Sequence, residues 1–72
     1  MSKLVDMLYK SAEADKAKAL LTLELLGKHP AGIGDHSTED FYKNAEEALL
    51  MLSEADDRLE AIGKYLMEKK VI

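Results

Sequence analysis

The sequence contains no cysteine, a single proline and only four glycines, and each scarcity excludes a structural feature. Without cysteine there is neither a disulfide framework nor a thiolate metal site, a composition typical of proteins in a reducing compartment. Pro30 and three of the glycines fall between residues 27 and 34. Since proline and glycine are the strongest helix breakers, the sequence predicts one break with a long uninterrupted segment on each side.

Long hydrophobic runs are also missing, and basic charge is in deficit. Ten basic against fourteen acidic residues give a net charge of −4, so the long-range field repels nucleic acid and anionic membranes. The first ten residues interleave Asp6 and Lys10 with apolar residues, which matches neither a signal peptide nor a membrane anchor. We expect a cytoplasmic protein with no nucleic-acid partner and no membrane association.

Residues 41–66 carry the clearest pattern in the chain. Apolar residues recur there alternately four and three residues apart, at Phe41, Ala45, Ala48, Leu52, Ala55, Leu59, Ile62 and Leu66. This 3.5-residue repeat is the a/d pattern of a helix that keeps one seam against a partner, whereas a strand would need strict alternation. We predict a helix over about residues 37–70, with Ser37 as its cap and Asp40 completing a capping box.

Residues 2–27 predict another helix, since alanine, leucine, lysine and glutamate dominate them. Ser2 can cap its start, and Gly27 is placed to end it in the left-handed conformation shortly before Pro30. The apolar seam of this helix is weaker. It comprises Val5, Leu8, Ala12, Ala19 and Leu26, with Asp15 and Thr22 at the intervening seam positions.

Folding the chain about residues 33–34 pairs the two seams in one register. The sequence numbers of two residues that face each other then add up to about 67. Small residues then meet in the middle, as Ala19 with Ala48, so the helices should approach closely there. Asp15 falls opposite Leu52, where a dry seam would cost a carboxylate several kcal/mol. We therefore expect the first helix to rotate or bend until Asp15 reaches water or a lysine. The predicted fold is all-α, a single-domain antiparallel helical hairpin.

Large apolar residues remain that cannot all face this seam. They are Leu20, Leu21, Leu23, Leu25, Leu49, Leu50 and Met51, and they lie alongside each other in the half nearer the loop. Exposed together they would form a patch larger than a soluble monomer usually carries. We predict a homo-oligomer with these residues at its interface, most simply a two-fold dimer forming a four-helix bundle. The alternative is that they thicken a single core.

The predicted loop, residues 28–36, holds the candidate binding residues. It is longer than most helix–helix connections, which have about 2–8 residues. Its candidates for binding a partner or a small ligand are His29, Gly32, Gly34, Asp35 and His36. Their spacing matches neither H-E-x-x-H nor Glu-x-x-His, and the glycines lack the strand and lysine of a P-loop. The alternative is a capped helix start with solvated charges, and we predict neither a metal nor a cofactor.

The segment from His29 to Leu66 resembles short uncharacterised proteins encoded by marine cyanophages. In those proteins a loop of the type H-P-x-G-I-G-D-H precedes a helix rich in alanine and glutamate, and this chain has HPAGIGDH at residues 29–36. The resemblance implies a small viral helical protein without an established activity, and therefore no catalytic residues. By analogy, such hairpins bind a host protein or form multimers that trap a small signalling nucleotide.

Two functional hypotheses stay open, neither of them enzymatic, since no serine, histidine and acid are arranged as a nucleophilic triad. The first is a homo-oligomeric interaction protein that modulates a host protein. The alternative is a small-ligand binding protein, for a nucleotide or a metal, that uses the GIGDH loop at a subunit interface.

Overall fold

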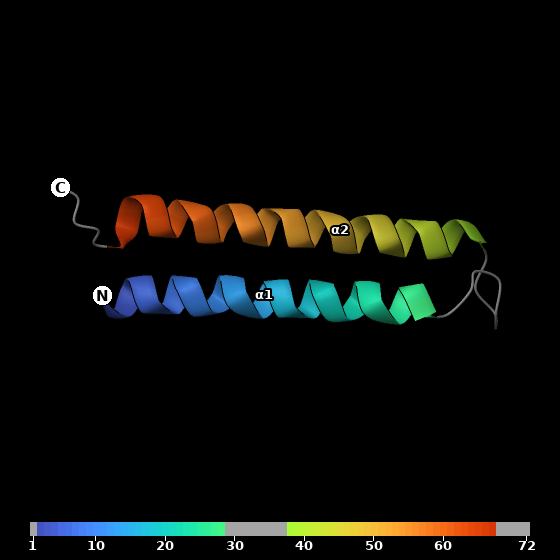
Figure 1. Ribbon diagram of the computed structural model, residues 1–72, viewed down its shortest axis with the longest axis horizontal. Coiled ribbons are helices and arrows are strands. Elements are labelled where there is room, and N and C mark those ends of the chain that lie inside the picture. Colours follow the sequence, from blue (N-terminus) through green and yellow to red (C-terminus); the bar gives the residue numbers. More distant parts are fainter. Residues whose placement is uncertain (1, 29–37, 68–72) are drawn as a thin grey trace.

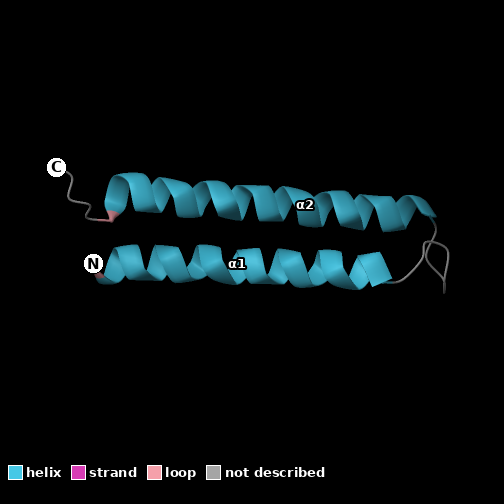
Figure 2. Cartoon of the chain, in the orientation of Figure 1, coloured by secondary structure: helices cyan, strands magenta, loops and turns pink. Residues whose placement is uncertain are grey.

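A computed structural model describes residues 2–28 and 38–67 of the chain. They form α1 (Lys3–Lys28), α2 (Thr38–Ala61) and a π-helical turn, η1 (Ile62–Leu66), that continues α2. The two long helices run side by side, and the start of α1 lies at the same end as η1 (Figure 1). Colouring by secondary structure shows helix along nearly all of the described chain (Figure 2). The predicted all-α antiparallel hairpin is confirmed.

Ser2 caps α1 as predicted. The backbone N–H of Val5 donates a hydrogen bond to the Ser2 hydroxyl oxygen at 3.1 Å. The Asp6 N–H donates to the Ser2 carbonyl oxygen at 2.9 Å. The Ser2 hydroxyl thereby satisfies one first-turn N–H group that has no partner within the helix, and the Asp6 bond is the first regular backbone bond of α1. The carboxylate of Asp6 also lies in this turn, where it complements the positive end of the helix dipole.

Two predicted helix ends differ from the structure. The helix α1 continues through Gly27 to Lys28, and the backbone of Gly27 is not left-handed, so the prediction that Gly27 ends the helix is wrong. Extending a helix adds a backbone hydrogen bond for each residue fixed, which offsets the low helix propensity of glycine. The second helix ends at Leu66, short of the predicted residue 70, because the backbone of Met67 is extended. The Met67 N–H donates a hydrogen bond to the Ile62 carbonyl and so completes the wide π-helical turn. The predicted Ser37 cap lies outside the described residues.

The contact between the helices is a line of small side chains. Ala12, Ala19 and Ala55 are fully shielded from solvent, and Ala48 and Ile62 are 6% exposed. All five are predicted seam residues, and their size is compatible with the close approach expected in the middle. Among the described residues, no large side chain is fully buried. The hairpin therefore has a thin contact layer in place of an enclosed core.

Asp15 is accommodated without a break in α1, which is helical throughout. Its carboxylate accepts a hydrogen bond from the Arg58 guanidinium at 2.6 Å, and its side chain is 35% exposed. The lysine next in sequence, Lys16, instead pairs with Asp56 at 3.0 Å. The expected route to water holds, but the charged partner is an arginine of α2. The long guanidinium side chain reaches the carboxylate from the opposite helix, so no bend is needed.

The molecule is a flat rod, 53 × 20 × 15 Å. Its radius of gyration is 16.2 Å, whereas a compact domain of this length would have about 11 Å. An elongated hairpin keeps much of its side-chain surface open to solvent. Within residues 2–28 and 38–67, neither helix combines the length and apolar character needed to cross a membrane.

Candidate interaction surface

The predicted loop site cannot be compared with the structure. His29, Gly32, Gly34, Asp35 and His36 all lie outside the described residues. Small-ligand binding by the loop therefore stays a prediction. Within the described part of the chain, no group of three acidic or histidine side chains comes together in an arrangement that could hold a metal ion.

Large apolar side chains lie open to solvent along both helices. Their exposed fractions run from 38% for Leu8 to 73% for Tyr65. The set is Leu4, Met7, Leu8, Leu20, Leu21, Leu25, Tyr42, Leu49, Leu50, Tyr65 and Leu66. It contains most of the predicted interface, while Leu23 and Met51 of that prediction are partly buried. The hairpin alone thus leaves exposed five of the seven side chains predicted at the interface.

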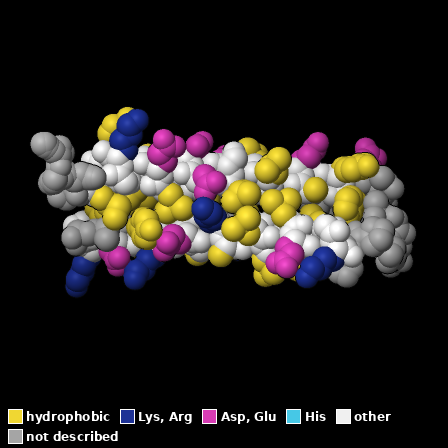
Figure 3. Space-filling view, in the orientation of Figure 1, with side chains coloured by type: hydrophobic (Ala, Val, Ile, Leu, Met, Phe, Trp, Pro, Cys, Tyr) yellow, Lys and Arg dark blue, Asp and Glu magenta, His cyan; other side chains and the backbone are white. Residues whose placement is uncertain are grey.

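One side of the hairpin is marked by the ion pair between Lys16 and Asp56. In helices paired along a 3.5-residue seam, residues seven apart lie on the same side. Leu23 is seven residues from Lys16, and Leu49 is seven residues from Asp56, so both belong here, together with Leu20. We call this the ion-pair side. Figure 3 shows hydrophobic side chains along the line between the helices, with an acidic and a basic side chain meeting across it.

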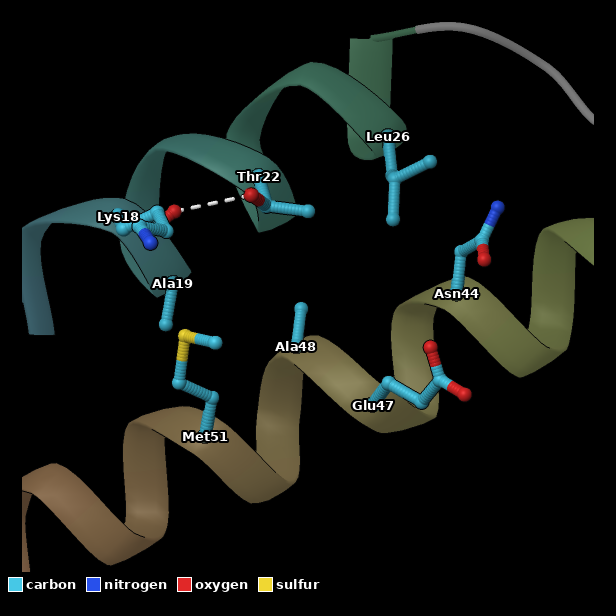
Figure 4. Close-up of a pocket in the computed structure, with 8 residues that line it drawn as sticks. All are labelled: Lys18, Ala19, Thr22, Leu26, Asn44, Glu47, Ala48 and Met51. Atoms are coloured by element: carbon cyan, nitrogen blue, oxygen red, sulfur yellow. Dashed lines mark hydrogen bonds between the residues drawn. The ribbon is translucent and has the colours of Figure 1, made fainter. Parts of the chain in front are cut away.

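A hollow of about 280 Å³ lies between the helices towards their loop end (Figure 4). Its lining residues are Lys18, Ala19, Thr22, Leu26, Asn44, Glu47, Ala48 and Met51. In the close-up, the side chains of Ala19, Ala48 and Met51 turn towards the space between the helices. The Thr22 hydroxyl donates a hydrogen bond to the Lys18 carbonyl at 2.9 Å, so its polar group is satisfied within α1. The floor of the hollow is apolar and its rim is polar.

A second hollow, of about 330 Å³, lies towards the open end of the hairpin. It is lined by Leu8, Ser11, Arg58, Ala61, Ile62, Tyr65 and Leu66. Its lining is more apolar than that of the first hollow, with Arg58 as the only charged member.

Both hollows lie on the same side of the hairpin. Ser11 of one and Lys18 of the other are seven residues apart on α1, and Arg58 and Met51 are seven apart on α2. We call this the groove side. Leu25, seven residues after Lys18, belongs to it with Leu21 and Met51. The predicted interface residues are therefore divided between two opposite sides of the hairpin, with Leu50 facing outward.

A second stripe of residues runs along the groove side of α1. Its members lie alternately three and four residues apart, each one position before a seam residue, and all are exposed. They are Leu4, Met7, Ser11, Ala14, Lys18, Leu21 and Leu25. We call them the outer stripe. Five of the seven members are apolar, which indicates a second contact surface on α1 in addition to the seam that α2 covers. Following this spacing in the sequence could have found the stripe, whereas grouping the leucines by proximity missed it.

Two ion pairs join the helices across the seam, Asp15 with Arg58 and Lys16 with Asp56. Exposed pairs of this kind stabilise a protein by at most about 1 kcal/mol each. Their main consequence here is register, because opposite charges meet only when the helices are aligned in this way. On the ion-pair side, a hydrogen bond from Tyr9 to the Glu13 carboxylate and the negative charge of that group raise the pKa of the Tyr9 phenol.

No family model, curated protein or solved structure matches this chain. The resemblance to cyanophage proteins stays an expectation.

Proposed function

We propose that this protein is a non-enzymatic interaction protein that works as a homo-oligomer and binds a host protein, in keeping with the viral resemblance. The observation that carries the proposal is the distribution of apolar side chains. Among the described residues, only alanines and Ile62 are buried, whereas leucines, a methionine and tyrosines along both helices remain open. A surface of this kind is a contact surface for another protein chain.

The energetics favour association over a free hairpin. Apolar surface gains about 25 cal/mol for each Å² removed from water, and the thin seam of alanines removes little of it. One broad face of the 53 × 20 × 15 Å rod exceeds the roughly 800 Å² per partner that stable interfaces bury. Pairing two hairpins would provide the enclosed core that one hairpin lacks.

After such pairing, the outward surface of α2 remains acidic. Asp57 and Glu60 are exposed there, and the whole chain carries a net charge of −4. The host partner that we propose therefore presents a basic surface. Its binding should weaken as salt is raised, because exposed charges more than a Debye length apart are screened.

Analytical ultracentrifugation tests the oligomeric state directly. We expect the wild-type chain to sediment at micromolar concentration as an assembly larger than its 8.0 kDa monomer. Leu21→Glu should dissociate the assembly, because it places a charge in the apolar contact. Ala17→Glu adds the same charge on the outward surface of α1 and should leave it intact. A monomeric wild-type chain at all accessible concentrations would remove the basis of the proposal.

A further inference from the structure

The outer stripe of α1 has the same apolar pattern when read in either direction. Its spacing is symmetric about Ala14, so an antiparallel copy of the helix pairs each member with another member. Leu4 then meets Leu25, Met7 meets Leu21, and Ala14 meets its own equivalent. Large apolar side chains meet near both ends and small ones meet at the centre, which lets the two helices approach closely.

The polar members of the stripe also fall opposite each other. Ser11 lies as far before Ala14 as Lys18 lies after it, to within one residue. In the antiparallel pair the Lys18 ammonium of one copy can donate a hydrogen bond to the Ser11 hydroxyl of the other. No leucine is forced against a charge, and the long methylene stem of lysine can lie along the apolar contact.

We propose that two copies of this chain form a two-fold dimer in which α1 packs antiparallel against α1 through the outer stripe, centred on Ala14. The loops then lie at opposite ends of a four-helix bundle. This inference rests on the proposed function and specifies it: the first partner is a second copy, seated on the groove side in a defined orientation.

The other two-fold arrangement on this side has both loops at one end. It would place α1 of one copy against α2 of the other. Each residue of α1 would then face, in the other copy, the same α2 position that it faces across the groove within its own chain. Leu21 would then lie near Glu47, and Leu25 near Asn44, both of which line the loop-end hollow. Burying these polar groups against leucine would cost free energy without a compensating hydrogen bond. In the antiparallel arrangement these two residues face α2 of the other copy and not the leucines of its outer stripe.

The hollows and charges agree with the antiparallel arrangement. The two-fold rotation that relates the copies brings the loop-end hollow of one copy, about 280 Å³, over the open-end hollow of the other, about 330 Å³. Neither hollow then stays open. On α2, Glu54 lies near the centre of the groove side, and Arg58 follows one turn later. The two Glu54 carboxylates then lie near each other beside the axis. The Arg58 guanidinium of each copy, which pairs with Asp15 of its own chain, comes within reach of the Glu54 carboxylate of the other copy.

Disulfide trapping tests this geometry, because the chain contains no cysteine of its own. A disulfide needs Cα atoms about 4.4–6.8 Å apart, which the proposed dimer provides at position 14 next to its axis. Under mild oxidation, Ala14→Cys should become a covalent dimer at least tenfold faster than Ala17→Cys, a control at another exposed alanine, on the outward surface. The double variant Leu4→Cys/Leu25→Cys should be joined between copies, with peptide mapping linking position 4 to position 25.

The outcomes separate the two proposals. A wild-type chain that sediments as a monomer overturns both this inference and the proposed function. A wild-type dimer in which Ala14→Cys reacts no faster than Ala17→Cys overturns this inference alone. The two single variants Ala14→Cys and Glu54→Cys can also be mixed. If the main product is a disulfide between position 14 of one copy and position 54 of the other, the antiparallel arrangement is overturned in favour of the one with both loops at the same end. Circular dichroism and sedimentation of each reduced variant check that it folds and assembles like the wild type.

Discussion

Asp15 is the residue at which the apolar seam and the solvation of charge conflict. It occupies a seam position of α1, yet its side chain keeps 35% of its exposure and pairs with Arg58. The ion pair removes the penalty of an unpaired carboxylate but fills the seam poorly, since neither charged group can be fully desolvated. The position is therefore a compromise that an apolar residue would not have to make.

Asp15→Leu should raise the free energy of unfolding by about 1–2 kcal/mol. The gain from burying a leucine side chain exceeds the loss of an exposed ion pair worth at most about 1 kcal/mol. Urea denaturation at a fixed protein concentration measures the change as a higher midpoint. Asp57→Leu, at an exposed position on the outer surface of α2, is the control and should give no gain. A lower midpoint for Asp15→Leu would show that the ion pair holds the register.

Tyr9 is a residue whose titration the structure perturbs. The Glu13 carboxylate, one turn later, raises the pKa of the phenol above its usual 10.0 through a hydrogen bond and then through its charge. A raised pKa means that folding favours the neutral phenol. The resulting stability is complete below the unfolded pKa, near 10, and is lost as the pH rises through the higher folded pKa.

Glu13→Ala should lower the pKa of Tyr9 towards 10.0. Spectrophotometric titration of tyrosinate measures it, with Tyr9→Phe identifying by difference which transition belongs to Tyr9. Glu46→Ala, on the other helix, serves as the control and should leave that transition in place. An unchanged pKa of Tyr9 in Glu13→Ala would show that the contact does not persist in solution.

At the scale of the helices, the last turn of the second helix departs from regular α-helical geometry. The π-helical η1 contains Gly63, and a Cβ built on this glycine would meet nothing within 4 Å. Its backbone is not in the left-handed region either. Neither space nor conformation within one chain therefore requires glycine at this position.

Gly63→Ala should raise the free energy of unfolding by about 0.5–1 kcal/mol, because alanine has the higher helix propensity. Thermal unfolding followed by circular dichroism measures the effect. Ala61→Gly, two residues earlier in the same segment, is the matched reverse change and should lower stability by a similar amount. Gly63 is seven residues after Asp56 and so belongs to the ion-pair side. If Gly63→Ala instead destabilises the protein, that result would indicate a contact with another chain on this side, away from the groove side.

At the scale of the whole molecule, shape and exposure point the same way. A radius of gyration of 16.2 Å and a contact layer of alanines describe an elongated hairpin with little enclosed core, and the dimer that we propose would enclose more of its apolar surface. Folding and association should therefore be linked. An assembly that forms only from folded chains makes stability depend on protein concentration.

The melting temperature should rise when the protein concentration is raised a hundredfold. Since only folded chains associate, mass action then draws the equilibrium towards the assembly. Melting curves recorded by circular dichroism at each concentration measure the shift. Leu21→Glu should remove the dependence and Ala17→Glu should retain it. A wild-type melting temperature that does not change with concentration would argue against linked folding and association.

The sequence by itself determined the features that depend on local chemistry. The 3.5-residue repeat predicted the second helix, composition predicted the first, and the matching of their seams predicted the hairpin. The alanines predicted the shielded seam that Ala19 and Ala48 now occupy. Ser2 was predicted as a cap because a hydroxyl before a helical segment satisfies free N–H groups. These predictions succeed because propensity, capping and periodicity act within a few residues along one chain.

Only the tertiary structure decided how the remaining surface is divided. The choice of Arg58 as the partner of Asp15, and the placing of Leu21 and Leu49 on opposite sides, depend on the relative rotation of two packed helices. The end of the second helix at Leu66 depends on a wide turn that the apolar repeat did not reveal. An apolar repeat defines which residues of a helix face a partner. The packing of the two helices defines which residues of both helices then lie on the same side of the hairpin.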